Sequence, residues 1–380
     1  MPTRELGERD LELLKDVLDS GVLGSLKEDR MVARFGREFA AAIGARHGVA
    51  MNAGMSALHA GVLASGARAG DEVICDPVVI FGSMAAMYAG AVPIYADVDA
   101  DSWNINPDTI EACITERTKA IIVTHMCGLP AEMGRVMEVA RRHRLFVIED
   151  CAHAMLATYR GQCVGTWGDV GAFSFQESKQ LSLGDGGMAV MNSEEAFREV
   201  SLHGSKPTFR SVGYGLHYNY RMTEVVAAMG IAQLERMPSY ISGFQAVVRA
   251  YTEGIAGIPW LVPQTGPAES VNTHHLWGCR FDGEQRGIAK AEFERVLTDE
   301  QCGIGFYTGM PAYRHPVMAQ RVAHALDCPS YTGTQNRYPE GTCPIAETLA
   351  PRIMLAGTWV TVEQAKAEAE RLRRAAERLG

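Results

Sequence analysis

The chain has 380 residues, of which 47% are hydrophobic and 21% charged, a composition typical of a globular enzyme with a sizeable core. Its formal net charge of −9 disfavours a protein that binds nucleic acid by neutralising phosphates. The nine cysteines form no CxxC pair and the N-terminus has no signal-peptide pattern, so we expect a cytoplasmic protein with reduced thiols and no metal site.

Short apolar runs alternate with helical patterns through the first two-thirds of the chain. The alternation predicts an α/β fold with a mainly parallel central sheet and helices on both faces. The connection over 150–168 is short and weakly helical, so we expect an irregular or antiparallel strand pairing there. The expected strands are 72–75, 92–95, 119–124, 145–149, 169–175 and 187–191, and the expected helices are 32–46, 55–66, 81–89, 107–114 and 131–143.

Residues 78–96 carry no charge and approach the length of a membrane span. They also contain Gly82, Gly90 and Pro93, and acidic segments flank them on both sides. We therefore expect a helix followed by a buried strand, and no membrane partner.

The pattern changes after about residue 223. A long helix starts at "TEVVAAMGIAQLERM", mixed segments follow, and the last twenty residues form an amphipathic helix with Thr361 as its N-cap. We expect a large domain over 1–235 and a smaller C-terminal α+β domain over 236–380.

A small-residue turn opens the helix in "NAGMSALHAGVLA", residues 52–64. Backbone N–H groups at a helix N-terminus, with the Ser56 hydroxyl beside them, suit a phosphate. Many helices begin with Gly and Ser for capping alone, so this turn identifies no site by itself.

Two carboxylates end the buried strand in "FVIEDCAHA", residues 146–154. Asp150 is the one expected to point into a cleft, where it either caps the next helix or pairs with a protonated ring nitrogen. His153 follows three residues later and is equally consistent with a packed histidine and with a ring contact.

Lys179 lies beyond the next strand, before Gly184, Gly186 and Gly187. It is either a surface lysine paired with Glu177 or Asp185, or a nucleophile. A phosphate turn, a strand-end Asp and a glycine-flanked Lys are together the parts that hold pyridoxal 5′-phosphate (PLP), with the lysine as its Schiff-base partner. This convergence favours the nucleophile.

The segments "VIEDCAHA", "GDVGAFSFQESKQLSLGDGGMAV" and "YNYRMTEVVAAMGIAQLERM" occur in an order that resembles the DegT/DnrJ/EryC1/StrS family. Members of that family are PLP-dependent aminotransferases of fold type I that aminate keto-sugars and keto-cyclitols. The resemblance covers residues 15 to 240 and is looser beyond.

The resemblance implies a role for each matching residue. Lys179 holds the cofactor and moves the proton, and Asp150 binds the pyridine nitrogen. The other implied cofactor contacts are His153 at the ring, Ser174 and the turn Gly54, Met55 and Ser56 at the phosphate, Phe81 stacked on the ring, and Asn219 at the phosphate of a neighbouring subunit. Met55 replaces a hydroxyl residue of the family pattern, which puts that side-chain contact in doubt, and a homodimer with shared active sites is implied. Without the resemblance, Phe81, Ser174 and Asn219 are interpreted as core, strand and turn residues.

The motif "FQESK" is similar to the aminocyclitol branch of the family, near the glutamine:scyllo-inosose aminotransferases. We therefore expect a keto-cyclitol or keto-aminoglycoside acceptor in antibiotic biosynthesis and L-glutamine as the donor. Acceptor-side candidates are Tyr307, Tyr313, Arg314 and His315, in a stretch that departs from the nucleotide-sugar pattern.

Three other functions are alternatives to a cyclitol aminotransferase. They are a nucleotide-4-keto-hexose aminotransferase, a non-catalytic relative that binds PLP or sugar, and a cysteine desulfurase. Retention of Lys179 argues against the second and against a dehydratase. The third lacks a cysteine in an evident loop with partners that lower its pKa.

Overall fold

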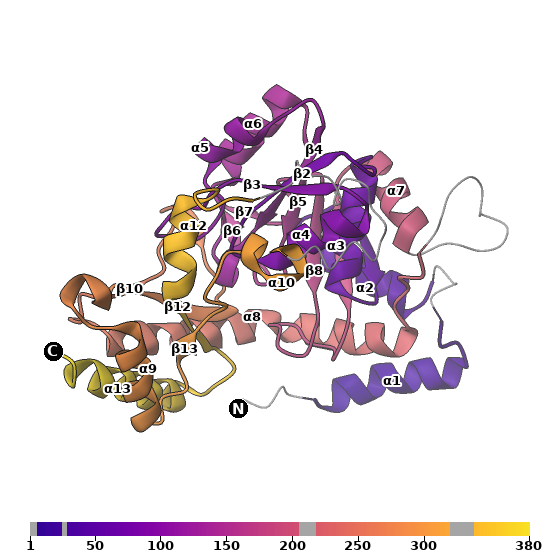
Figure 1. Ribbon diagram of the computed structural model, residues 1–380. Coiled ribbons are helices and arrows are strands. Elements are labelled where there is room, and N and C mark those ends of the chain that lie inside the picture. Colours follow the sequence, from indigo (N-terminus) through magenta and orange to yellow (C-terminus); the bar gives the residue numbers. More distant parts are fainter. Residues whose placement is uncertain (1–5, 25–28, 205–217, 320–337) are drawn as a thin grey trace.

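The computed structural model describes residues 6–24, 29–204, 218–319 and 338–380. A seven-stranded sheet with the strand order β1-β9-β8-β5-β4-β2-β3 forms its centre (Figure 1). Only β9 within this sheet runs antiparallel to its neighbours, so the predicted mainly parallel sheet is confirmed. The strands are β1 (His47–Met51), β2 (Glu72–Cys75), β3 (Val92–Tyr95), β4 (Thr118–Thr124), β5 (Phe146–Asp150), β8 (Val170–Ser174) and β9 (Gly187–Met191).

The strand pairing across residues 150–168 is regular and parallel, so the expectation of an irregular or antiparallel pairing there was wrong. Ile148 lies opposite Val170, and Asp150 lies opposite Ala172. The connection contains a small hairpin, β6 (Thr158–Tyr159) and β7 (Gln162–Cys163), which pairs with β11 (Ser270–Val271). The connection between β5 and β8 is long enough to bring the chain back to the edge of the sheet where β5 begins, as a parallel pairing of β8 with β5 requires.

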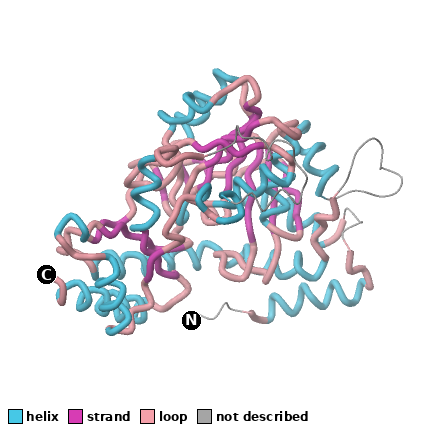
Figure 2. The backbone as a smooth tube through the Cα atoms, viewed as in Figure 1, coloured by secondary structure: helices cyan, strands magenta, loops and turns pink. Residues whose placement is uncertain are grey.

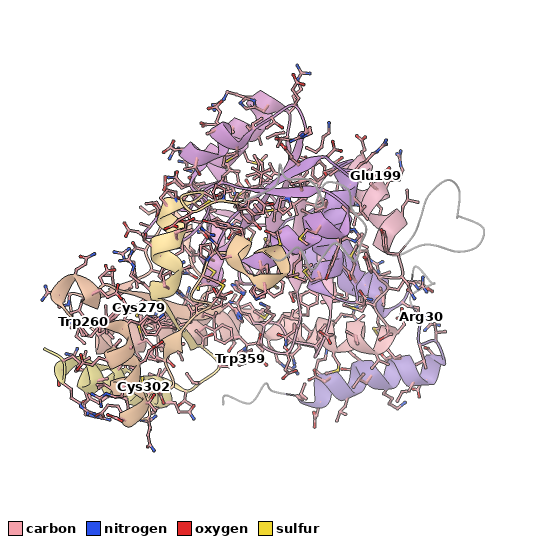
Figure 3. The ribbon with its side chains drawn as sticks, viewed as in Figure 1. Arg30, Glu199, Trp260, Cys279, Cys302 and Trp359 are labelled. Atoms are coloured by element: carbon pink, nitrogen blue, oxygen red, sulfur yellow. The ribbon has the colours of Figure 1, made fainter. Side chains whose placement is uncertain are left out.

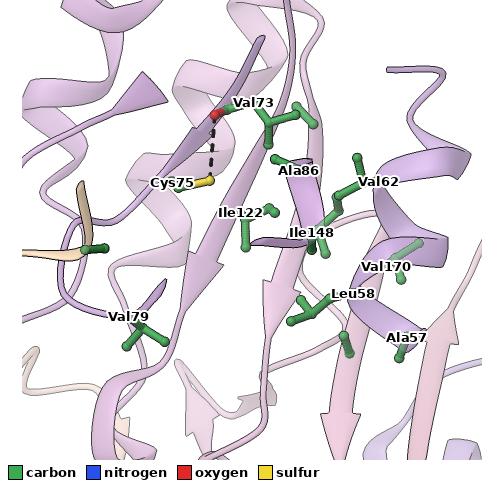
Figure 4. Packing of buried hydrophobic residues seen from close by; sticks show 14 of the residues in the cluster. Ala57, Leu58, Val62, Val73, Cys75, Val79, Ala86, Ile122, Ile148 and Val170 are labelled. Atoms are coloured by element: carbon green, nitrogen blue, oxygen red, sulfur yellow. Dashed lines mark hydrogen bonds between the residues drawn. The ribbon is translucent and has the colours of Figure 1, made fainter. Parts of the chain in front are cut away.

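Alternate residues of the sheet face opposite layers of helices, as the two-residue repeat of a strand requires. One face packs on α3 (Gly54–Ala64), α4 (Ile80–Tyr88) and α7 (Glu194–Gly204), where Leu58 meets Ile148 within one buried cluster (Figure 4). The other face packs on α2 (Met31–Ile43), α6 (Met133–His143) and α8 (Glu224–Gly254). The predicted layers on both faces are therefore confirmed.

A second, antiparallel sheet with the order β10-β12-β14-β13 lies at one end of α8, beside α9 and α13 (Figures 1 and 2). Its cluster of buried residues includes Trp260 and Cys279, with Cys302 packed at the edge (Figure 3). The elements are β10 (Leu261–Pro263), β12 (Leu276–Phe281), β13 (Gly305–Phe306), β14 (Ile353–Gly357), α9 (Lys290–Asp299) and α13 (Val362–Glu377). The domain boundary at 235 stays a prediction, and α8 passes through it without a break.

The remaining elements connect these layers. α1 (Glu8–Ser20) packs along α8, and α13 begins with the predicted N-cap, where Thr361 Oγ1 accepts the N–H of Gln364 at 3.1 Å. Residues 78–96 form α4 and β3 as expected, and no helix in the described ranges is long and apolar enough to cross a bilayer. The short elements are α5 (Pro107–Ile110), η1 (Glu111–Cys113), η2 (Met126–Gly128), η3 (Gly283–Arg286), η4 (Ala312–Arg314), α10 (Pro316–Ala319), α12 (Pro344–Leu349) and η6 (Ala350–Arg352).

Candidate active site

The candidate site lies at the carboxyl edge of the central sheet, where ligands of parallel sheets bind. Neighbouring parallel strands each end there in a polar residue. Thr124 ends β4, Asp150 ends β5 and Ser174 ends β8, while Asp76 directly follows β2. Thr124 and Asp150 are partners in the strand register, so their side chains start from adjacent positions.

Asp150 is buried and only 3% exposed. Its Oδ1 accepts the N–H of Ala152 at 3.1 Å, and no donor to its Oδ2 occurs in the described part of the chain. Burial raises the pKa of the Asp150 carboxyl, while the Ala152 N–H and the nearby Lys179 act in the opposite direction. The segment after Asp150 is a turn rather than a helix, so this carboxylate caps no helix and keeps one oxygen available.

Lys179 lies in the turn between β8 and β9. Its backbone N–H donates to Gln176 O at 2.8 Å, and its carbonyl accepts the indole N–H of Trp359 at 3.2 Å (Trp359 is labelled in Figure 3). Burial lowers the pKa of the Lys179 amine, and the charges of Asp150 and Cys127 partly offset this effect. The amine and the Asp150 carboxylate therefore lie within electrostatic reach of each other, and an amine with a lowered pKa is a better nucleophile at neutral pH.

The N-terminus of α3 meets the end of β8. A Cβ added at Gly54 would lie 2.6 Å from Ser174 Cβ and 3.0 Å from Ser174 Oγ. The first backbone N–H groups of α3 and the Ser174 hydroxyl thus converge on one place, which suits an anion. Ser56 is buried and its hydroxyl donates to Asn52 Oδ1 at 2.7 Å, whereas Met55 is half-buried.

Two histidines lie together near the lysine. The rings of His153 and His275 are 4.4 Å apart between centroids, and the Nδ1 atoms of both are buried with no hydrogen-bond partner among the described residues. Burial, with the nearby Lys179 charge, lowers the pKa of both histidines well below the usual range. Both rings are therefore neutral, as a ring that contacts an aromatic cofactor would be.

The structure places Phe81 and Asn219 at the border of the site. Phe81 lies in the first turn of α4 and is 48% exposed. Asn219 is exposed, and its carbonyl accepts the Nδ2–H of Asn52 at 3.3 Å, two residues before the α3 turn. Their roles on a cofactor ring and on a neighbouring subunit stay predictions.

The four acceptor-side candidates lie in different surroundings. Tyr307 is half-buried and interacts with Cys127 and Asp76, and burial raises its pKa to about 12. Tyr313 is buried, and its hydroxyl donates to Glu347 Oε1 at 2.5 Å, which gives it a structural role. Arg314 and His315 are exposed. The acceptor-side roles of Tyr307, Tyr313, Arg314 and His315 stay predictions.

Sequence reasoning missed three residues that share this edge: Asp76, Cys127 and His275. Asp76 follows a buried strand directly, which is the signal that identified Asp150 and should have identified Asp76 also. Cys127 interacts with the Lys179 charge from a left-handed backbone position with φ 60°. No local pattern marks Cys127 or His275, because only the tertiary fold brings η2 and the residue before β12 to the lysine.

Glu149, the neighbour of Asp150, points into a different environment. Its carboxylate accepts the N–H groups of Gly165, Trp167 and Gly168 at 2.7–2.8 Å, and it contacts His125 Nε2 at 3.1 Å. His125, Glu149 and Cys151 are metal-ligating residue types within reach of one another. Because the Glu149 oxygens are committed to these bonds, the cluster is explained as a structural network, and the absence of a metal site stays a prediction.

Comparisons with known proteins agree with this geometry. Residues 4–369 match the DegT/DnrJ/EryC1/StrS aminotransferase family. The chain is 37% identical over 313 residues, 79% of its length and 75% of the relative's, to a Streptoalloteichus tenebrarius protein provisionally named L-glutamine:3-amino-2,3-dideoxy-scyllo-inosose aminotransferase. It is 36% identical over 347 residues to GDP-perosamine synthase of Escherichia coli O157:H7, covering 86% of this chain and 92% of the relative.

A solved structure shares the fold along almost the whole chain. The crystal structure of S. venezuelae DesV superimposes with a TM-score of 0.85 at 28% sequence identity, covering 98% of this chain and 95% of DesV.

Proposed function

The chain belongs to the DegT/DnrJ/EryC1/StrS aminotransferase family, and we propose from this premise that it transfers an amino group from L-glutamine to a keto-cyclitol or keto-aminoglycoside. The single observation that carries the chemistry is the half-buried, partly desolvated Lys179 amine within electrostatic reach of the buried Asp150 carboxylate, at the edge where ligands of such sheets bind.

The cofactor of this enzyme family is PLP, and the residues of this chain fit it. The absence of a side chain at Gly54 lets the N-terminus of α3 approach Ser174 closely, so the helix N–H groups and the Ser174 hydroxyl lie together where a phosphate could bind. The unpartnered Nδ1 of His153 and the open Oδ2 of Asp150 are polar atoms for which a ring offers partners. When bound, PLP supplies an electron sink for the transferred amine's carbon.

The chain's own residues then have distinct tasks. Lys179 would hold the cofactor covalently and would move a proton at the reacting carbon, since its lowered pKa increases the neutral fraction of the amine. Asp150 would keep a proton on the ring nitrogen, since a buried carboxylate is stabilised by an adjacent cation. His153 would contact the ring as a neutral group.

The acceptor class rests on two observations. The "FQESK" motif before the glycine turn is similar to the aminocyclitol branch, and several relatives are named as glutamine:inosose aminotransferases. We also propose a role in antibiotic biosynthesis, which the resemblance to the aminocyclitol branch implies. Tyr307 is the residue best placed to contact the acceptor, because it interacts with Cys127, which in turn interacts with Lys179.

A second candidate function is amination of a nucleotide-linked keto-hexose. It is favoured by the GDP-perosamine synthases among the relatives, one of which matches 86% of this chain. Both functions use the same cofactor residues and differ only in the acceptor.

We also propose a cytoplasmic homodimer with shared active sites, in which Asn219 reaches the cofactor phosphate of the other subunit. The support is the family resemblance, together with the exposed position of Asn219 near the α3 turn.

The purified protein tests these proposals in two steps. Its absorption spectrum should contain a cofactor band that disappears in Lys179→Ala and persists in Lys366→Ala, an exposed lysine on α13. Glutamine and glutamate are then supplied in turn with scyllo-inosose, GDP-4-keto and UDP-4-keto hexoses. Glutamine-dependent amination of inosose alone supports the first function, and turnover restricted to a nucleotide sugar supports the second.

A further inference from the structure

Asp76 is a buried acid at the candidate site for which neither the family resemblance nor the sequence motifs provide a role. It follows β2 and is 3% exposed. Its Oδ1 accepts the N–H groups of Val78 and Val79 at 2.9 and 2.8 Å, and its Oδ2 accepts the Thr124 hydroxyl at 2.6 Å. All three of these donor residues are themselves buried.

These bonds connect the start of α4 to the strand ends that carry Asp150. Val79 is the N-cap of α4 and lies two residues before Phe81 (Val79 is labelled in Figure 4). Thr124 is the register partner of Asp150. One carboxylate therefore fixes the turn that presents Phe81 and bonds to the residue beside Asp150.

The Asp76 carboxylate also interacts electrostatically with the Asp150 carboxylate. Burial raises the pKa of Asp76 to about 6, and the nearby Asp150 contributes to this increase. Two carboxylates so close to each other in a buried site repel unless a cation lies between or beside them. The amine of Lys179 is one cation there, and a protonated cofactor ring would be the other.

We propose that Asp76 is a positioning residue that fixes the entry to α4 and whose negative charge increases the proton affinity of the Asp150–cofactor–Lys179 group. The proposal rests on the proposed PLP chemistry and adds to it a second acid, which does not contact the cofactor. A negative potential at this edge favours the protonated, cationic forms of the ring and of the lysine nitrogen bound to it.

The other ionisable groups facing Asp76 are Cys75, Cys343 and Tyr307, and those facing Asp150 are His125 and Lys179. Burial raises the pKa values of both cysteines and of Tyr307, so these three groups stay neutral around neutral pH. His153 and His275 near Lys179 also stay neutral. Cys75, Cys343, Tyr307, His153 and His275 therefore do not mask the Asp76 charge around neutral pH.

Asp76→Asn in the cofactor-loaded protein tests the proposal. The amide keeps an oxygen for the Val78 and Val79 N–H groups and can donate to the Thr124 hydroxyl, so only the charge is lost. The pH at which the bound cofactor's absorption spectrum changes should move lower by about half a unit or more. Thr124→Val, which removes a donor that stabilises the charge, should shift it in the same direction by less.

Asp169→Asn is the matched control. Asp169 is also a carboxyl whose pKa is raised by burial, but it bonds Val147 N at 2.8 Å, at the opposite end of β5. The Asp169→Asn substitution should not change the pH at which the cofactor's absorption spectrum changes.

Unfolding of the cofactor-free proteins separates a charge effect from a structural one. The folded state binds the Asp76 proton more tightly than the unfolded state, so Asp76 costs stability above its ordinary pKa, and the cost is complete above pH about 6. Asp76→Asn should therefore unfold at an equal or higher temperature than the wild type at pH 8. The proposal would be overturned if Asp76→Asn unfolded at a lower temperature than the wild type and the pH of the spectral transition were unchanged in both Asp76→Asn and Thr124→Val. A wild-type protein with no cofactor band would instead overturn the proposed function.

Discussion

Gly54 and Ser174 approach each other so closely that a single added carbon at Gly54 would lie 2.6 Å from Ser174 Cβ. Real Cβ contacts are not this short, so a Gly54→Ala protein must move α3 away from the end of β8. The displacement separates the helix N–H groups from the Ser174 hydroxyl, which together form the phosphate site. We expect the affinity for PLP to fall about tenfold or more, measured by titrating the apoprotein with PLP.

The control for this substitution is Gly243→Ala in α8, where an added Cβ meets nothing within 4 Å. It should leave PLP affinity unchanged and stabilise the helix by up to ~1 kcal/mol. Unchanged affinity in Gly54→Ala would show that the phosphate binds elsewhere.

Replacing Lys179 by Met should stabilise the cofactor-free protein while abolishing its activity. The folded-state pKa of the amine lies below its ordinary value, so the unfolded chain binds the proton more tightly. The amine therefore destabilises the fold at neutral pH, and this cost disappears only above the ordinary lysine pKa of about 10.4. We expect a higher unfolding temperature for Lys179→Met at pH 7.5 and a smaller difference at pH 10.5.

Lys366→Met, on the exposed surface of α13, should change neither the activity nor the unfolding temperature. If Lys179→Met unfolds at a lower temperature than the wild type at pH 7.5, the amine is not in a desolvated site.

Glu149 and Asp150 are adjacent, and their substitutions should have opposite consequences. Glu149→Gln replaces an acceptor of three backbone N–H groups by an amide with one oxygen, so we expect a loss of about 2–4 kcal/mol in unfolding free energy. Asp150→Asn loses the partner of the ring nitrogen, so we expect kcat to fall by about 10²-fold or more with little loss of stability. Urea unfolding and steady-state kinetics on both variants measure the two effects.

The reverse pattern, with stability lost in Asp150→Asn and activity lost in Glu149→Gln, would mean that the two carboxylates exchange these roles.

The parts of the fold that could be predicted from the sequence are those encoded by local patterns. The strand 187–191 and the helix 81–89 were placed within one residue of β9 and α4, because apolar runs and turn residues bound them. β1 was missed, since "HGVAM" is short and contains a glycine. The parallel β5–β8 pairing was also missed, because the excursion through β6 and β7 depends on pairing with β11, more than 100 residues away.

The candidate site also contains residues that local sequence patterns identify and residues that only tertiary contacts bring together. Asp150 ends one strand and Lys179 follows another, and the Gly54 turn opens a helix, features that sequence alone can identify. His275 lies directly before β12 and Cys127 lies in η2, and only tertiary packing brings them close to the lysine. Tyr313 was named for its place in a motif, but its hydroxyl binds Glu347, a contact with a residue 34 positions away.

The proposed sharing of active sites between two subunits has a test that does not depend on a dimer structure. Lys179→Ala and Asn219→Ala proteins, each inactive or strongly impaired, are mixed under conditions that exchange subunits. If Asn219 serves the partner's cofactor, a mixed dimer has one site with both defects and one site with none. Random exchange makes half of the dimers mixed, so activity should recover to about one quarter of the wild-type value.

If Asn219 instead serves the site of its own chain, each site of a mixed dimer retains one defect. No activity above the sum of the separate variants should then appear. Mixing Lys179→Ala with Asp150→Asn is the matched control, because both residues belong to the same chain's site, and this mixture should show no recovery.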